Sequence, residues 1–108
     1  MQGPSFSVDT ACSSAIVAFV QGANAIMTGT SNLALCCGAN LLVDTYVFNS
    51  FWHGQMLSKD NHCFTFDARA NGYARSEACG VFLLTKFTKD ALAEPISFGI
   101  NQDGASNG

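Results

Sequence analysis

A single cysteine, Cys12, stands where a strand-prone run gives way to a helical pattern. Residues 6–8 are typical of a short strand, and residues 8–14 read VDTACSS. A thiol at a helix N-terminus lies in a field of partial positive charge, which favours the thiolate and makes the cysteine a nucleophile near neutral pH. The other interpretation is a small buried cysteine in a tight turn, because free cysteine is among the most buried residue types. Position alone does not decide between them.

The remaining groups that could do chemistry are the other cysteines and the two histidines. None of the 5 cysteines lies in a C-x-x-C pair, and neither Cys36-Cys37 nor His62-Cys63 has zinc-site spacing. We therefore predict no metal site and interpret Cys36 and Cys37 as packing residues of a strand. This cysteine usage favours a reducing, cytoplasmic setting.

Charge is scarce and unevenly distributed along the chain. The 108 residues include 8 Asp and Glu against 5 Lys and Arg, with no basic face that would suggest nucleic acid or an anionic membrane. Residues 10–43 hold no charged residue and no histidine. A small free-standing domain normally charges its surface, so we predict that this segment is interior to a larger fold. Polar residues interrupt it well short of a membrane span, and no signal peptide is expected.

The first part of the chain predicts a strand, a helix and a second strand. Apolar residues recur at helical spacing over residues 13–28, and Gly29 suits the left-handed residue that ends a helix. The helix has no charged face, so we expect burial nearly all round, with Gly22 allowing close approach to a neighbouring backbone. Residues 33–37 are typical of a strand buried on both faces of a parallel sheet. With residues 6–8 they predict a βαβ-like unit.

The second part of the chain is less regular. The aromatic-rich residues 41–57 predict short helices and loops that line a cavity. Residues 58–78 form a polar connection long enough to be functional or interface-forming. Next we expect a strong strand at residues 80–87 and a helical turn at 88–94 that Pro95 stops. A short strand at 96–100 and a polar loop at 101–108 complete the expectations.

Several motifs, in order along nearly the whole chain, carry a family resemblance. They are GPS at residues 3–5, VDTACSS at 8–14, MLS at 56–58, CFTFDA at 63–68, GYAR at 72–75, Gly80, and NQDGASNG at 101–108. The chain resembles the ketosynthase (β-ketoacyl synthase) domain of type I or modular polyketide synthases. The final octet is similar to the polyketide branch rather than to the discrete fatty-acid condensing enzymes.

The resemblance implies an α/β fold of the thiolase-like, layered αβαβα kind. Residues 1–108 would be a partial domain, the nucleophile region of its N-terminal half. The implied reaction is acyl transfer followed by decarboxylative Claisen condensation with a malonyl-type extender. Cys12 would take the acyl chain as a thioester, and its backbone N–H would help to bind the oxyanion. Phe51 matches, by its distance before MLS, an aromatic residue that gates the acyl pocket, although an ordinary core phenylalanine is the alternative.

The resemblance also implies partners and the limits of the site. No cofactor would be bound directly, because substrates arrive on the phosphopantetheine of an acyl carrier protein. Adjacent polyketide synthase domains and a second copy in a homodimer are expected. The family's two histidines and its lysine belong to motifs after residue 108, so we expect no catalytic role for His53 or His62 and no condensation by the isolated chain. Arg75 and Glu77 are expected to form an ion pair or part of a polar network.

The chain departs from the family pattern at a few positions. Cys37 stands where the family has the first of two glycines, and Ser76 and Ala78 stand where it has glycines on either side of a glutamate. A substituted glycine that served a positive φ would strain its turn. The segment around Pro95 is shorter than in the family. A fatty-acid-type β-ketoacyl synthase and a non-condensing scaffold or binding relative are the alternative functions.

Overall fold

The computed structural model describes residues 3–86 and 88–105. Its regular elements, in chain order, are η1 (Ala11–Ser13), α1 (Ser14–Met27), β1 (Leu33–Asn40), α2 (Thr45–His53) and β2 (Ala78–Thr85). The chain divides into two compact units, residues 1–38 with 80–108 and residues 39–79.

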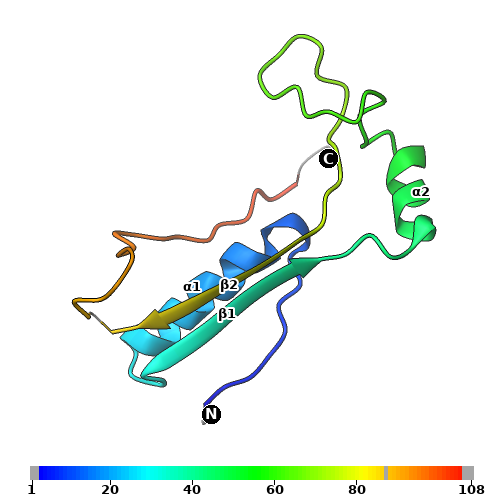
Figure 1. The fold of residues 1–108 in the computed structure, drawn as a ribbon. Helices are drawn as coiled ribbons and strands as arrows, with labels where there is room; N and C mark the ends of the chain where they lie inside the picture. Colours follow the sequence, from blue (N-terminus) through cyan, green and yellow to red (C-terminus); the bar gives the residue numbers. More distant parts are fainter. Residues whose placement is uncertain (1–2, 87, 106–108) are drawn as a thin grey trace. The chain divides into compact units, whose positions relative to one another are not determined.

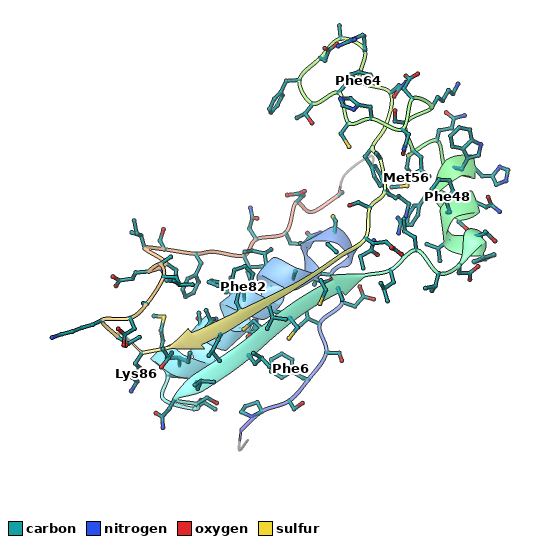
Figure 2. The ribbon with its side chains drawn as sticks, viewed as in Figure 1. Phe6, Phe48, Met56, Phe64, Phe82 and Lys86 are labelled. Atoms are coloured by element: carbon teal, nitrogen blue, oxygen red, sulfur yellow. The ribbon has the colours of Figure 1, made fainter. Side chains whose placement is uncertain are left out.

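In the first unit, α1 packs on one face of a two-stranded sheet formed by β1 and β2. The two arrows point in opposite directions in Figure 1, so the pair is antiparallel. The contact includes an edge-to-face pair between Phe19 and Phe82, with ring centroids 5.4 Å apart. Phe82 is labelled on β2 in Figure 2. Among the residues of this unit that the structure describes, the buried apolar side chains are Val20, Ala23, Ile26 and Cys36.

Two glycines set how closely α1 approaches the strand β1. A Cβ atom on Gly22 would overlap the Sγ of Cys36, and one on Gly38 would lie 2.5 Å from the Cβ of Ala15. Neither position has room for a side chain. The close approach expected at Gly22 is therefore confirmed, although the nearest atom of the neighbour belongs to a side chain rather than to the backbone.

The helix predicted at residues 13–28 is confirmed as α1, and Gly29 follows it with a φ of +75°. The expectation of burial nearly all round is wrong within this chain. The side chains of Ile16 and Met27 are 61% and 74% exposed, because the described residues cover only the helix face that packs on the sheet.

The strand at residues 33–37 is confirmed but continues to Asn40, and its parallel, doubly buried character is wrong. Leu33 and Leu35, on the sheet face away from α1, are 53% and 50% exposed. Residues 6–8 form no strand, so the βαβ-like unit is wrong as well. The backbone N–H and C=O groups of a strand need hydrogen-bond partners on a neighbouring strand. For β1 that neighbour is β2.

The strand expected at residues 80–87 is confirmed as β2, which begins at Ala78 and ends at Thr85. Phe87 lies outside the described residues. The helical turn expected at 88–94 is reduced to one bond, from the Ala91 N–H to the Thr88 carbonyl oxygen at 3.2 Å. Residues 96–100 form no strand, and residues 101–105 are irregular as expected. The rest of that loop also lies outside the described residues.

The second unit begins its helix at a cap and then returns along a polar loop. The Asp44 carboxylate accepts the Tyr46 N–H at 2.8 Å, and α2 confirms the short helix expected between residues 41 and 57. Beyond it, the Tyr73 N–H donates to Met56 and the Ser58 N–H donates to Tyr73, each at 3.0 Å. These bonds close residues 58–72 into a loop, which confirms an irregular polar connection.

Gly72 makes that closure possible. Its φ is +131°, and a Cβ atom there would lie within 2.7 Å of the backbone of residues 56–58. Only glycine adopts this conformation and leaves that space empty.

No helix in residues 3–86 and 88–105 has the length and apolar character needed to span a membrane.

Candidate active site

Hydroxyl groups hold the backbone around Cys12. The Ser14 Oγ accepts the Thr10 N–H at 2.9 Å and donates to the Ala11 carbonyl oxygen at 2.7 Å. The Ser13 hydroxyl donates to the Thr10 carbonyl oxygen at 2.9 Å. A carboxylate oxygen of Asp9 accepts the Ala11 N–H at 3.1 Å. The polar side chains of the motif are thus used to build the turn.

The residue before Cys12 has an uncommon backbone conformation. Ala11 has a φ of +55°, in the left-handed region that a residue with a Cβ adopts at a cost of roughly 1–2 kcal/mol. Strain of this kind gathers at functional sites, where the surrounding structure holds it in place. The hydrogen bonds on either side of Ala11 do so here.

Cys12 is an exposed residue just before α1. Its thiol is exposed, and the alternative of a buried packing cysteine does not hold within this chain. It lies in η1, which leads straight into α1. Among the described residues, the Cys12 N–H has no hydrogen-bond partner, as is usual in the first turn of a helix. An exposed thiol beside an unpaired backbone N–H is compatible with acyl transfer to a cysteine.

Cys36 is the opposite case. It is buried between β1 and α1, and this burial, reinforced by the neighbouring Cys37, raises the pKa of its thiol. A neutral buried thiol is a packing group, so the expectation for Cys36 is confirmed. Cys37 is exposed.

Phe51 belongs to the second unit, where it is half-buried on α2. The guanidinium carbon of Arg75 lies 4.9 Å from the centre of its ring. The Arg75 Nε is buried and, within the part of the chain that the structure describes, has no hydrogen-bond partner. Because Cys12 lies in the first unit, the two predicted site residues are on separate parts of the chain.

The second unit also carries two open surface concavities, partly lined by residues from the segment 41–57. The larger, of about 700 Å³, includes His53 among its lining residues: Trp52, His53, Gln55, Leu57, Lys59 and Asn71. The smaller, of about 230 Å³, is lined by residues 40–44 with Val47, Phe48 and Arg75. His62 lies elsewhere in the loop, with its ring centroid 4.6 Å from that of Phe64.

The departures from the family glycines leave the backbone unstrained. Cys37, Ser76 and Ala78 are not among the residues with positive φ. The close approach between β1 and α1 falls instead on Gly38, which is retained. The strain that a replaced glycine would cause therefore does not arise at these positions.

Arg75 and Glu77 do not form the expected ion pair. Glu77 does belong to a polar network, since its Oε1 accepts the Leu42 N–H at 2.7 Å. Within residues 3–86 and 88–105, the ion pair present joins Arg69 and Asp67 at 2.8 Å.

Two cation–π pairs in the second unit were not indicated by the sequence pattern. Besides Arg75 on Phe51, the Arg69 guanidinium carbon lies 4.6 Å from the centre of the Phe64 ring. Hydrogen bonds from Arg69 also hold the pKa of the Asp67 carboxyl below its usual range. The Asp-x-Arg spacing of this pair was a local signal, whereas Arg75 and Phe51 meet only through the closure of the loop.

Comparison with known proteins places these features in a family. Residues 1–90 match the family model for the β-ketoacyl synthase N-terminal domain. The chain is 40% identical over 114 residues to a phenolphthiocerol/phthiocerol polyketide synthase of Mycobacterium tuberculosis, a match covering 100% of this chain and 6% of that protein. It is 44% identical over 92 residues to the orsellinic acid synthase of Armillaria mellea, covering 85% of this chain and 4% of that one.

A solved structure shares the fold. The oxazolomycin ketosynthase domain of Streptomyces albus matches with a TM-score of 0.75 and 32% sequence identity, over 78% of this chain and 15% of that chain. The expected α/β, thiolase-like fold is thereby confirmed. The chain spans only a small part of each relative, 6% and 4% of the two synthases. It belongs to the β-ketoacyl synthase family, with its relatives among the polyketide synthases.

Proposed function

We propose that this chain is the nucleophile-bearing part of a polyketide ketosynthase and that Cys12 is the residue acylated. The Cys12 thiolate attacks the carbonyl carbon of an acyl thioester. The phosphopantetheine that carried the acyl group is released as its thiolate. The negative charge that develops on the carbonyl oxygen is stabilised by the Cys12 backbone N–H. The product is an acyl group held on the Cys12 sulfur.

The second half of the proposed reaction uses a malonyl-type extender. Loss of carbon dioxide leaves its electron pair on the α-carbon, and this carbanion attacks the carbonyl carbon of the Cys12 thioester. The new carbon–carbon bond forms as the carbon–sulfur bond breaks, so Cys12 returns to the thiolate. In this proposal groups outside residues 1–108 stabilise the carbanion, because we expect no catalytic role for His53 or His62.

One observation carries the proposal. The turn of residues 9–14 uses hydroxyl and carboxylate groups to hold Ala11 in a left-handed conformation. The Cys12 thiol is exposed, and among the described residues the Cys12 N–H has no hydrogen-bond partner. A packing cysteine would need neither the strained turn nor the unpaired amide. The position of the turn at the start of α1 adds the field of the helix to the site.

The test is acyl loading of the polypeptide that carries this segment, followed by intact-protein mass spectrometry. Wild-type protein incubated with an acyl-pantetheine thioester should gain one acyl group, and Cys12→Ala should gain none. Cys79→Ala, which removes another exposed thiol, is the matched control and should load normally. Undiminished loading of Cys12→Ala would remove Cys12 as the nucleophile. Normal loading without any β-ketoacyl product would favour the non-condensing alternative.

We further propose that Phe51 gates the acyl pocket and that an acyl carrier protein delivers the substrates on phosphopantetheine. Adjacent polyketide synthase domains and a homodimer complete the assembly. The half-buried aromatic ring supports the first point, and the relatives named as polyketide synthases support the rest. Phe51→Leu should shift the preference among acyl chain lengths without abolishing loading. An unchanged preference would return Phe51 to the role of a core residue.

A further inference from the structure

We propose that Arg75 is a positioning residue, whose guanidinium holds the ring of Phe51 in the orientation that sets the acyl-chain preference of the site. The inference rests on the proposed gating role of Phe51. Arg75 is not expected to touch the substrate. It acts through the ring on which it lies.

The contact itself is a cation–π pair. The Arg75 guanidinium carbon is 4.9 Å from the Phe51 ring centre, within the range at which the ring quadrupole attracts a cation. Phe51 is half-buried, so solvent screens the contact less than it would on an open surface. A planar guanidinium also restricts the tilt of the ring beneath it, which an ammonium group does less well.

Arg75 is held in place by its neighbours in sequence. The Asn40 amide donates to the carbonyl oxygen of Ser76, and the Leu42 N–H donates to Glu77 at 2.7 Å. On the other side, the Tyr73 bonds to residues 56 and 58 fix the chain two residues before Arg75. The guanidinium therefore starts from an anchored backbone, as a positioning role requires.

Within the described residues, no carboxylate forms an ion pair with Arg75. Its Nε is buried without a partner, and the ion pair present in that part of the chain belongs to Arg69 and Asp67. Asp44 lines the same concavity of about 230 Å³ as Arg75 but forms no ion pair with it in the described structure. The Phe51 ring is the partner that the structure gives to this cation, which argues for stacking rather than for a salt bridge as its purpose.

The experiment is a double-mutant cycle on the polypeptide that carries this segment, with loading rates measured for a short and a long acyl-pantetheine thioester. Phe51→Leu should change the ratio of the two kcat/KM values. Arg75→Gln should change it in the same direction by about fivefold, the loss expected for one cation–π contact. The double variant should match Phe51→Leu alone. Arg75→Lys, which keeps a cation over the ring, should restore part of the wild-type ratio.

Arg69→Gln is the matched control, since it removes the same charge and a similar cation–π pair from an exposed part of the same unit. It should leave the ratio unchanged. Circular dichroism of each variant identifies any that fails to fold, and Arg75→Lys then replaces Arg75→Gln in the comparison as the milder perturbation, with a smaller shift in the same direction expected.

The outcomes distinguish the positioning role of Arg75 from the gating role of Phe51 on which it rests. If Phe51→Leu shifts the ratio and the Arg75 variants do not, the gate stands and the positioning role of Arg75 is overturned. If Phe51→Leu leaves the ratio unchanged, the gate itself fails. If Arg75→Gln raises KM equally for both chain lengths, or still shifts the ratio in the Phe51→Leu background, Arg75 acts by direct binding rather than through the ring.

Discussion

At the scale of single residues, the two cysteines on either side of α1 have opposite environments. Cys12 is exposed in a turn at the helix N-terminus, and Cys36 is buried between helix and strand. Alkylation should therefore distinguish them. We expect iodoacetamide at neutral pH to label Cys12 in native protein and to reach Cys36 only after denaturation, as measured by peptide mass spectrometry. Equal labelling of the two in native protein would contradict the structure.

The raised pKa of Cys36 also predicts a pH dependence of stability. Burial disfavours the thiolate in the folded state, whereas the unfolded chain ionises near the ordinary value of 9.0. The contribution of the neutral thiol is thus fully present below pH 9.0 and is lost as the pH rises through the higher folded pKa. Urea unfolding at increasing alkaline pH should show this decline. Cys36→Ala should flatten it, and an identical decline in that variant would assign the effect to other groups.

The hydroxyl of Ser14 predicts a link between the turn and its chemistry. Ser14→Ala removes one bond to the Thr10 N–H and one to the Ala11 carbonyl oxygen, at a cost of about 1–2 kcal/mol in the free energy of unfolding. Once these two hydrogen bonds are lost, Ala11 relaxes from its left-handed conformation. The rate of acyl loading should therefore fall by a larger factor than the loss of unfolding free energy alone would cause. Ser50→Ala, which removes the hydroxyl bond to Tyr46 on α2, is the control. Equal loading by both variants would separate the turn from the reaction.

At the scale of elements, local pattern predicted whatever depends on local chemistry. Helical spacing predicted α1, and the position of Gly29 predicted where α1 ends. The apolar runs predicted β1 and β2. The strands expected at residues 6–8 and 96–100 failed because a strand also needs a partner, which its own residues do not reveal. The Arg75–Phe51 pair was missed for a related reason. It depends on the bridge between Leu57 and Tyr73, a contact between distant parts of the sequence.

That bridge makes Gly72 the most sensitive position of the second unit. Gly72→Ala should lower the free energy of unfolding by about 3 kcal/mol, because it combines a strained φ with backbone overlap at residues 56–58. Gly80→Ala is the matched control, since a Cβ there meets no atom within 4 Å. Chemical denaturation of the polypeptide that carries this segment measures both. A loss at Gly72 no larger than that at Gly80 would contradict the described closure of the loop.

At the scale of the whole molecule, the chain exposes an unusual amount of apolar surface. Its buried hydrophobic residues, among those described, are Val20, Ala23, Ile26, Cys36 and Leu57. Val43 is 85% exposed, and Leu33 and Leu35 leave one sheet face uncovered. The uncharged segment of residues 10–43 predicted such a need for cover from a larger fold. The exposed surface supports that interpretation.

We therefore predict that a polypeptide of residues 1–108 alone folds without cooperativity and does not condense acyl groups. A core of this size leaves little to offset the entropy lost on folding. The isolated chain should bind an apolar dye strongly and show a broad thermal transition, and incubation with acyl and malonyl thioesters should give no β-ketoacyl product. A sharp transition with weak dye binding would contradict the first statement, and a detected product the second.

Whether Cys12 carries the acyl group is decided by locating the adduct on the protein. The polypeptide that carries this segment is incubated with an acyl-pantetheine thioester, digested, and mapped by mass spectrometry over all 5 cysteines. We expect one hydroxylamine-sensitive acyl group, on the peptide containing Cys12. An adduct on Cys37, Cys63 or Cys79 with Cys12 unmodified would show that the nucleophile lies elsewhere.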